Sequence, residues 1–300
     1  MKKRSLRSTV LDFDIGGMGE ARLKGVRFAD YRICETDDDF QLIPDFLHPD
    51  QITAIEPYYK VTGQELLLRI LNLYKSLDTE NLENAAATIR EWSLKNIHPY
   101  TTPEFFACGD LSWEEHWINL WGSGIGSFSV RDFIYECKKF YETASAVLTL
   151  TLIQTGREKE ADSLYHTYFY DGGFDLYKEY MHNEHYSKEF LAADNYAMIP
   201  PVSMKIEFDT ERMQPIFVAE VYSIFDVLYY TLTRMVATNA PALDENWHRQ
   251  CVALCEACGN LFIKEGNRQK YCKSPLCQAE RNNRKAQAYY LRKKKDSDPD

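Results

Sequence analysis

Apolar and polar residues alternate along the first part of the chain. The apolar positions are Leu11, Phe13 and Ile15, then Ala21 and Leu23 beyond a glycine pair, then Tyr31 and Ile33. A period of two residues is that of a strand with one buried face. We therefore predict two or three short strands, forming a β segment of residues 1–50 that packs on the body. A loop is predicted to follow, marked by Asp37-Asp38-Asp39, Pro44 and Pro49.

From Thr62 the apolar period becomes that of a helix. Thr62 and Glu65 have the spacing of a capping box, in which two side chains satisfy backbone N–H groups at a helix start. A second helix is predicted at residues 82–92, and a third is expected to begin at Ser129 and to stop at Gly156. The apolar positions are Leu66, Ile70, Leu73, Tyr74 and Leu77; Leu82, Ala85, Ala86, Ile89 and Trp92; and Phe133, Ile134, Cys137, Phe140, Tyr141, Ala144, Leu148 and Leu152.

The second half of this body is predicted to be helical with one strand. A tyrosine-rich helical stretch covers about residues 158–192, and a strand is indicated by the alternation of Val202, Met204, Ile206 and Phe208. After Pro215 an apolar helix is expected to run to about Val236. Three charged residues interrupt it, which indicates a buried helix and not a membrane span: Glu220, Asp226 and Arg234. The expected fold is mainly α with a minor antiparallel β part, and the helical body covers residues 51–245.

Four cysteines near the carboxyl end have the spacing of a metal site. They form a C-x2-C pair, a gap of thirteen residues and a C-x4-C pair: Cys255, Cys258, Cys272 and Cys277. Four thiolates complete the tetrahedral shell of a structural Zn²⁺. The cationic start of the chain is not followed by an apolar leader, so we expect a reducing cytoplasm, where metal-bound thiolates are favoured over disulfides. Four unrelated buried thiols, a catalytic zinc, or Cys251 as a competing ligand are the alternatives.

Local signals predict the backbone of this carboxyl-terminal module, residues 250–295. Gly259 suits the positive φ that follows a C-x2-C turn. The apolar run Leu261–Ile263 is predicted to form a hairpin with Arg268–Tyr271 across a turn at Gly266-Asn267.

A helix is predicted to carry the last cysteine. Ser274 is placed as its N-cap and Pro275 as its first residue, so Cys277 is expected in the first turn. The C-x2-C turn, known as a zinc knuckle, is followed by a hairpin and then by a ligand at a helix N-terminus. This is the order of elements in a treble-clef zinc finger. Tyr289, Tyr290 and Leu291, farther along this helix, are expected to pack back onto the module or the body.

The distribution of charge also sets the carboxyl-terminal module apart from the rest of the chain. The whole chain has a net charge of -10, yet residues 251–295 hold eleven Lys and Arg against three acids. The bulk should therefore repel nucleic acid while this segment attracts it. The cations expected to contact DNA, four of them at helical spacing along one side, are Arg281, Arg284, Lys285, Arg292 and Lys293. A solvated basic tail, or a tail docked on the acidic body, is the alternative.

The module resembles the CGNR-type zinc-finger proteins of bacteria, in which a helical domain precedes a four-cysteine finger. The matching features are Cys258-Gly259 with Phe262 behind it, Tyr271 before Cys272, the C-x4-C pair and the basic helix. The resemblance covers about 40 residues, and Gln278 stands where the family has the glycine of Gly-Asn-Arg. It implies cysteine ligation of zinc and a DNA-binding role, and it assigns no base-reading residue.

Other residues have the types used in catalysis without a convincing pattern. His182 and His185 have i, i+3 spacing in place of the i, i+4 spacing of zinc proteases. Cys108 with His116 has the residue types of thiol catalysis, and the glycines of residues 122–126 lack the lysine that ends a phosphate-binding loop. No enzyme is therefore predicted.

The sequence thus favours a cytoplasmic bacterial regulatory protein that binds DNA through a zinc finger. Its helical body is expected to sense an effector, to form a homodimer or to bind a protein partner, and no membrane association is expected. Two other classes stay open. One is a zinc-stabilised protein-interaction module without nucleic-acid binding, and the other is a helical enzyme with an appended finger.

Overall fold

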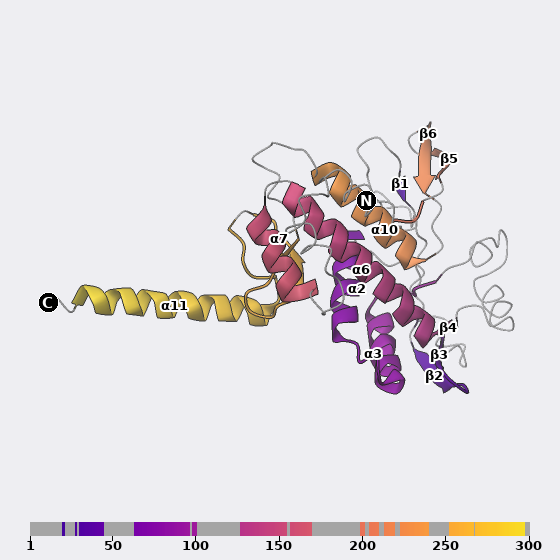
Figure 1. Ribbon diagram of the computed structural model, residues 1–300, viewed down its shortest axis with the longest axis horizontal. Helices are drawn as coiled ribbons and strands as arrows, with labels where there is room; N and C mark the ends of the chain where they lie inside the picture. Colours follow the sequence, from indigo (N-terminus) through magenta and orange to yellow (C-terminus); the bar gives the residue numbers. More distant parts are fainter. Residues whose placement is uncertain are drawn as a thin grey trace, which may run out of the picture. The chain divides into compact units, whose positions relative to one another are not determined.

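A computed structural model describes 13 stretches of the chain: residues 20–21, 28, 30–44, 63–96, 98–100, 127–154, 157–169, 199–201, 204–209, 213–219, 223–239, 252–266 and 268–297. Within them the fold is mostly helical with small sheets (Figure 1). Contacts divide the chain into two units. The first comprises Met1–Ala144 with Ala193–Ala237, and the second comprises Ser145–Ala192 with Thr238–Asp300.

The first unit contains a three-stranded antiparallel sheet. Its order is β2 (Tyr31–Glu35), β3 (Phe40–Pro44) and β4 (Phe128–Ser129). The predicted loop at the aspartates is confirmed as the turn between β2 and β3, closed by a 2.8 Å bond from the N–H of Thr36 to the carbonyl of Asp39. The placement of Pro44 in a loop is wrong, because it pairs with Tyr31 as the last residue of β3. Proline lacks an N–H, and a strand end tolerates it.

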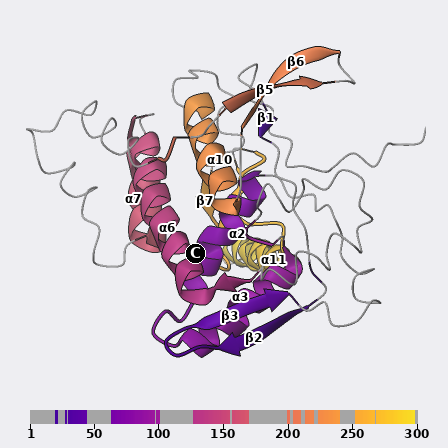
Figure 2. The same ribbon diagram turned by 90° about the vertical axis from the view of Figure 1, so that its right-hand side faces the viewer.

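Helix α3 (Leu82–Lys95) packs against β2 and β3 (Figure 2). Asn81 caps its start by accepting a 3.1 Å bond from the N–H of Asn84. On the sheet side, the Arg90 guanidinium donates to the carbonyl of Tyr31 at 2.7 Å and pairs with the carboxylate of Asp30. These bonds fix the helix to the first strand of the sheet.

Helices α2 (Gly63–Ser76), α6 (Val130–Gln154) and α10 (Ile224–Asn239) complete the described helices of the first unit, to which α6 belongs as far as Ala144. The predicted start of α6 is confirmed, since Ser129 accepts a 2.9 Å bond from the N–H of Asp132. Aromatic contacts join the helices: Tyr74–Tyr141, Trp92–Phe133, Phe133–Phe225 and Phe140–Tyr229. The core is therefore rich in aromatic rings, as the composition suggests.

The apolar run after residue 213 forms a strand before it forms a helix, so the prediction of one helix from Pro215 is wrong. β6 (Gln214–Ala219) pairs along its whole length with β5 (Met204–Asp209), and β1 (Glu20–Ala21) joins β6 in parallel. α10 begins only at Ile224, where Ser223 and Asp226 bond reciprocally as a capping box. Pairing with β5 makes residues 214–219 a strand, and the apolar pattern of these residues alone does not predict that pairing.

A buried histidine lies beside the sheet. The hydroxyl of Tyr31 and Nδ1 of His98 share a 3.0 Å hydrogen bond, and the rings of Phe28 and Phe128 enclose the pair. Burial lowers the pKa of His98 to about 3. The imidazole is therefore neutral in the folded protein at all but strongly acid pH.

This histidine should make the first unit sensitive to acid. The unfolded chain binds a proton at His98 near pH 6.5, and the folded chain does so only near pH 3. The contribution to stability is therefore present above pH 6.5 and is lost as the pH falls toward 3. Between about pH 7.5 and about pH 5 we expect the free energy of unfolding to fall by about 2 kcal/mol through this group.

The measurement is urea unfolding of the wild type and of His98→Gln at both pH values. Other histidines titrate in both proteins, so the difference between the two pH dependences isolates His98. Equal pH dependences would contradict the prediction.

The second unit contains the rest of α6, followed by α7 (Glu158–Leu164) and a single π-helical turn, η1 (Tyr165–Phe169). The predicted tyrosine-rich helical stretch is confirmed as far as Phe169, and its remainder lies outside the described residues. The unit continues with β7 (Val252–Leu254), β8 (Leu261–Ile263) and α11 (Pro275–Ser297). None of the helices in the described stretches has the length and apolar character to cross a bilayer.

Candidate metal centre and basic helix

The first cysteine pair lies in the turn of a small hairpin. β7 and β8 pair antiparallel, with Leu254 opposite Leu261, and the N–H of Cys255 donates to the carbonyl of Asn260 at 2.9 Å. The turn then closes by a 2.9 Å bond from the N–H of Gly259 to the carbonyl of Cys255. Gly259 has φ +72°, which confirms the prediction that glycine is needed there.

The strand Leu261–Ile263 has a different partner from the predicted one. It pairs with Val252–Leu254, upstream of the first cysteine pair, while residues 268–271 form no strand. The tight C-x2-C turn brings β7 and β8 together directly. The chain after the hairpin instead turns at Gly266, as predicted, where its carbonyl accepts a 3.0 Å bond from the N–H of Gln269; Asn267 lies outside the described residues.

Two hydrogen bonds bring the second cysteine pair to the first, and a third joins the start of α11 to Cys272. The carbonyl of Lys270 accepts from the N–H of Glu256 at 3.0 Å, and the N–H of Cys272 donates to Sγ of Cys255 at 3.3 Å. Farther on, the side chain of Gln278 donates to the carbonyl of Cys272 at 2.6 Å. The predicted helix start is confirmed, because α11 begins at Pro275 with Cys277 in its first turn.

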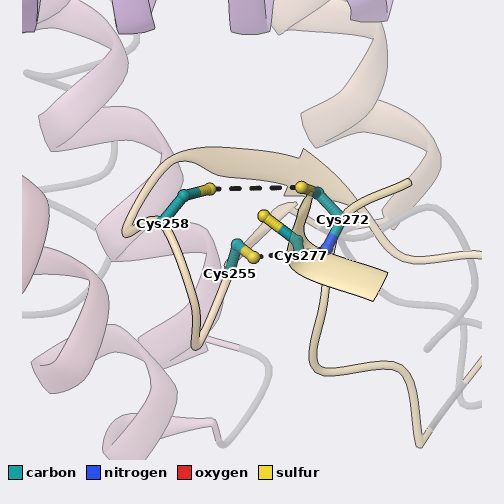
Figure 3. Close-up of side chains that lie close together, drawn as sticks. All are labelled: Cys255, Cys258, Cys272 and Cys277. Atoms are coloured by element: carbon teal, nitrogen blue, oxygen red, sulfur yellow. Dashed lines mark hydrogen bonds between the residues drawn. The ribbon is translucent and has the colours of Figure 1, made fainter. Parts of the chain in front are cut away.

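The four sulfurs converge on one point (Figure 3). All lie within 4.8 Å of one another, and Sγ of Cys258 is 4.0 Å from Sγ of Cys272. Sulfurs at about 2.3 Å from a tetrahedral zinc ion lie about 3.8 Å apart, so the spacing fits that ion. The four cysteines are free thiols, and they could hold a metal ion.

The cysteine thiols have divergent pKa values. Burial raises the pKa of Cys255, but backbone N–H groups, above all that of Cys272, outweigh burial and lower the pKa to about 6. Hydrogen bonding with Cys272, together with burial, raises the pKa of Cys277 to about 12. Four thiolates this close repel one another, and a bound cation removes that penalty. The chemistry of the donor set therefore suits a divalent, thiolate-preferring metal.

The apolar core around this cluster is small. Cys255, Phe262 and Cys277 are its buried residues, and Ala253, Tyr271 and Cys272 pack against them. An apolar cluster of this size supplies little folding free energy without a metal. The cysteine module, defined here as residues 252–266 and 268–280, therefore combines a possible metal site with a small apolar cluster.

The helix α11 extends the chain beyond this module (Figure 1). It has 23 residues, or about 34 Å at about 1.5 Å per residue. The predicted nucleic-acid contacts are all exposed on it: Arg281, Arg284, Lys285, Arg292 and Lys293. Between Glu280 and Asp296 the helix has no acidic residue.

The expected packing of the aromatic residues on α11 is wrong. Tyr289, Tyr290 and Leu291 are 64%, 70% and 64% exposed. They lie beyond Ala288, the last helix residue that lines the groove beside α11.

Sequence reasoning missed a second set of cations. A groove of about 1140 Å³ separates the loop before and after Cys272 from the first half of α11. Arg268, Lys270 and Lys273 line one wall, opposite Arg281, Arg284 and Lys285 on the other. The signal in the sequence is the run of three cations within residues 268–273, which is weaker than the signal of the basic helix.

The other residues considered from the sequence lie outside the described residues: Cys108, His116, the glycines of residues 122–126, His182, His185 and Cys251. Within the described stretches, the four cysteines are the single group of three or more potential metal ligands. No protein-family model matches the chain, and neither the curated proteins nor the solved structures include a significant match.

Proposed function

We propose that this chain is a bacterial zinc-finger protein that binds DNA in a regulatory role in the cytoplasm. The observation that carries the proposal is the junction of the four-cysteine cluster with α11. The helix carries the proposed fourth ligand, Cys277, in its first turn and then presents exposed cations with no acid between Glu280 and Asp296. The metal would hold the module together, and the helix would make the contacts.

Zinc is the proposed ion, in a structural role and a treble-clef arrangement. Four thiolates fill a tetrahedral shell and leave no position for water or substrate. When bound, the ion would supply folding free energy and no catalytic chemistry. Cys255 and Cys258 would hold it from the hairpin turn, and Cys272 and Cys277 from either side of the helix start.

DNA is the proposed ligand because a helix fits the major groove and cations neutralise phosphates. Arg281, Lys285 and Arg292 lie at i, i+4 and i+11, so they share one side of the helix. The resemblance of the module to CGNR-type zinc fingers supports the same ligand. The helical body would then sense an effector or form a dimer, and no catalysis is proposed.

The test is binding of the full-length protein to duplex DNA over a salt series. If the five proposed helix cations each neutralise one phosphate, log K should fall against log salt with a slope of about -4.5. The slope becomes steeper if further cations take part. A full-length protein that shows no salt-dependent affinity for DNA would exclude the proposal.

A zinc-stabilised protein-interaction module is the second candidate. The exposed apolar group Tyr289, Tyr290 and Leu291 favours it, because aromatic residues are enriched in protein interfaces. In this case deletion of residues 250–300 should abolish a protein complex or expose apolar surface, and DNA binding should never be seen. The salt series therefore separates the two candidates.

A further inference from the structure

We propose that the groove beside α11 holds one phosphodiester backbone between two cationic walls. This inference rests on the proposed function and adds the second wall, Arg268, Lys270 and Lys273, to the helix cations. The backbone would run between these residues and Arg281, Arg284 and Lys285. The ligand would therefore be held from both sides, whereas the exposed helix alone would contact it from one side.

The charge and size of the groove favour a polyanion. Six cations line it against one acid, Glu265. Its volume of about 1140 Å³ exceeds the roughly 300–1000 Å³ of most small-molecule pockets. Most of the side chains that line it are charged or amide groups, and their net charge is strongly positive. An extended, repeating anion matches both walls.

The two walls are held in place by hydrogen bonds. The side chain of Gln278 ties the helix to the loop through the carbonyl of Cys272 at 2.6 Å. Within the loop, the side chain of Gln269 accepts from the N–H of Glu265 at 2.8 Å and donates to the carbonyl of Tyr271 at 3.1 Å. The groove is therefore preformed, which lowers the entropic cost of binding.

Acidic partners occupy some of these cations in the free protein. Lys273 pairs with Glu265 at 2.5 Å, Lys270 with Glu256 at 2.7 Å and Arg284 with Glu280 at 2.7 Å. Exposed ion pairs of this kind are weak, so phosphates can replace the carboxylates. Arg284 also lies over the ring of Tyr271, 5.9 Å from its centroid, which holds the guanidinium at the groove.

The loop wall is tested with Arg268→Gln/Lys273→Gln in the full-length protein. Loss of two phosphate contacts should reduce the magnitude of the salt slope by about 1.8 and weaken binding roughly 60-fold at about 0.1 M salt. The matched control is Lys138→Gln/Lys159→Gln, which makes the same charge change outside the groove and also removes an ion pair, Lys138–Glu142. Metal content per chain is measured for both variants, because Lys273 adjoins Cys272.

A second variant should act in the opposite direction. Glu265→Gln removes the one acid that lines the groove and its ion pair with Lys273, so binding should tighten several-fold and the slope should steepen by up to about 0.9. This gain cannot be produced by misfolding.

Duplex and single-stranded DNA of the same sequence form the two arms of the experiment. The changes in affinity and salt slope caused by the variants are expected on whichever form the wild type binds. That form shows whether the bound phosphodiester backbone belongs to duplex or to single-stranded DNA. If the loop variant behaves as its control while neutralised helix cations weaken binding, the groove inference is overturned and the proposed function stands. If the wild type binds neither form, both are overturned.

Discussion

Removal of the metal is expected to unfold the cysteine module. Zinc binding by small four-ligand peptides is worth about 10–16 kcal/mol, which exceeds what the small apolar cluster around the cysteines can supply. Titration of the full-length protein with a strong chelator should therefore remove hydrogen-exchange protection from β7, β8 and the first turns of α11. The amides of α2 and α3, which lie in the other unit, should keep theirs.

A ligand substitution should have the same effect without a chelator. Cys277→Ser removes one thiolate from a closed shell of four, and the metal content should fall well below one ion per chain. Cys34→Ser is the matched control, because Cys34 is a half-buried free thiol in β2 and no part of the cluster. Protection that survives complete loss of the metal would contradict a structural role for the site.

Neutralising the cations of α11 should have the largest effect on DNA binding. The variant replaces Arg281, Arg284, Lys285, Arg292 and Lys293 with Gln. If each cation contacts one phosphate, the salt slope should lose about 4.5 and the affinity should fall by roughly four orders of magnitude at about 0.1 M salt. Each substitution keeps a good helix former at an exposed position, so the helix itself should persist.

The control variant keeps the positive charge at the five positions and changes the shape of the side chains. In this variant each of the five arginines and lysines is exchanged for the other, so phosphate neutralisation should survive and the slope should stay near that of the wild type. Any loss of sequence preference in this variant would identify guanidinium contacts to base edges. A Gln variant that retains the full slope would show that α11 does not contact the phosphates.

The parts of the site that the sequence predicts correctly are those set by neighbouring residues. The C-x2-C spacing, the positive φ of Gly259 and the helix start at Pro275 each follow from a few adjacent residues. The convergence of the two cysteine pairs follows as well, because a four-thiolate site needs all four. Local chemistry is sufficient for these features.

Two of the errors have a different cause, because a strand partner elsewhere in the chain decides the structure. Residues 214–219 form an apolar run that suits either a helix or a strand, and β5 decides between them. β8 likewise had two candidate partners, β7 before it in the chain and residues 268–271 after it, and it pairs with β7. The second cationic wall was missed because its position opposite α11 depends on how the loop returns to Cys255.

The location of Cys272 and Cys277 would couple the two proposed ligands of this module, the metal and the anion. Cys272 lies between Tyr271 and Lys273, which line the loop wall, and Cys277 lies in the first turn of the helix that forms the other wall, so a metal held by both cysteines would join the two sides of the groove. An anion bound in that groove would therefore retain the metal more tightly, and by linkage the metal would raise the affinity for the anion by the same factor. Metal exchange measured with and without DNA then reports on occupancy of the groove.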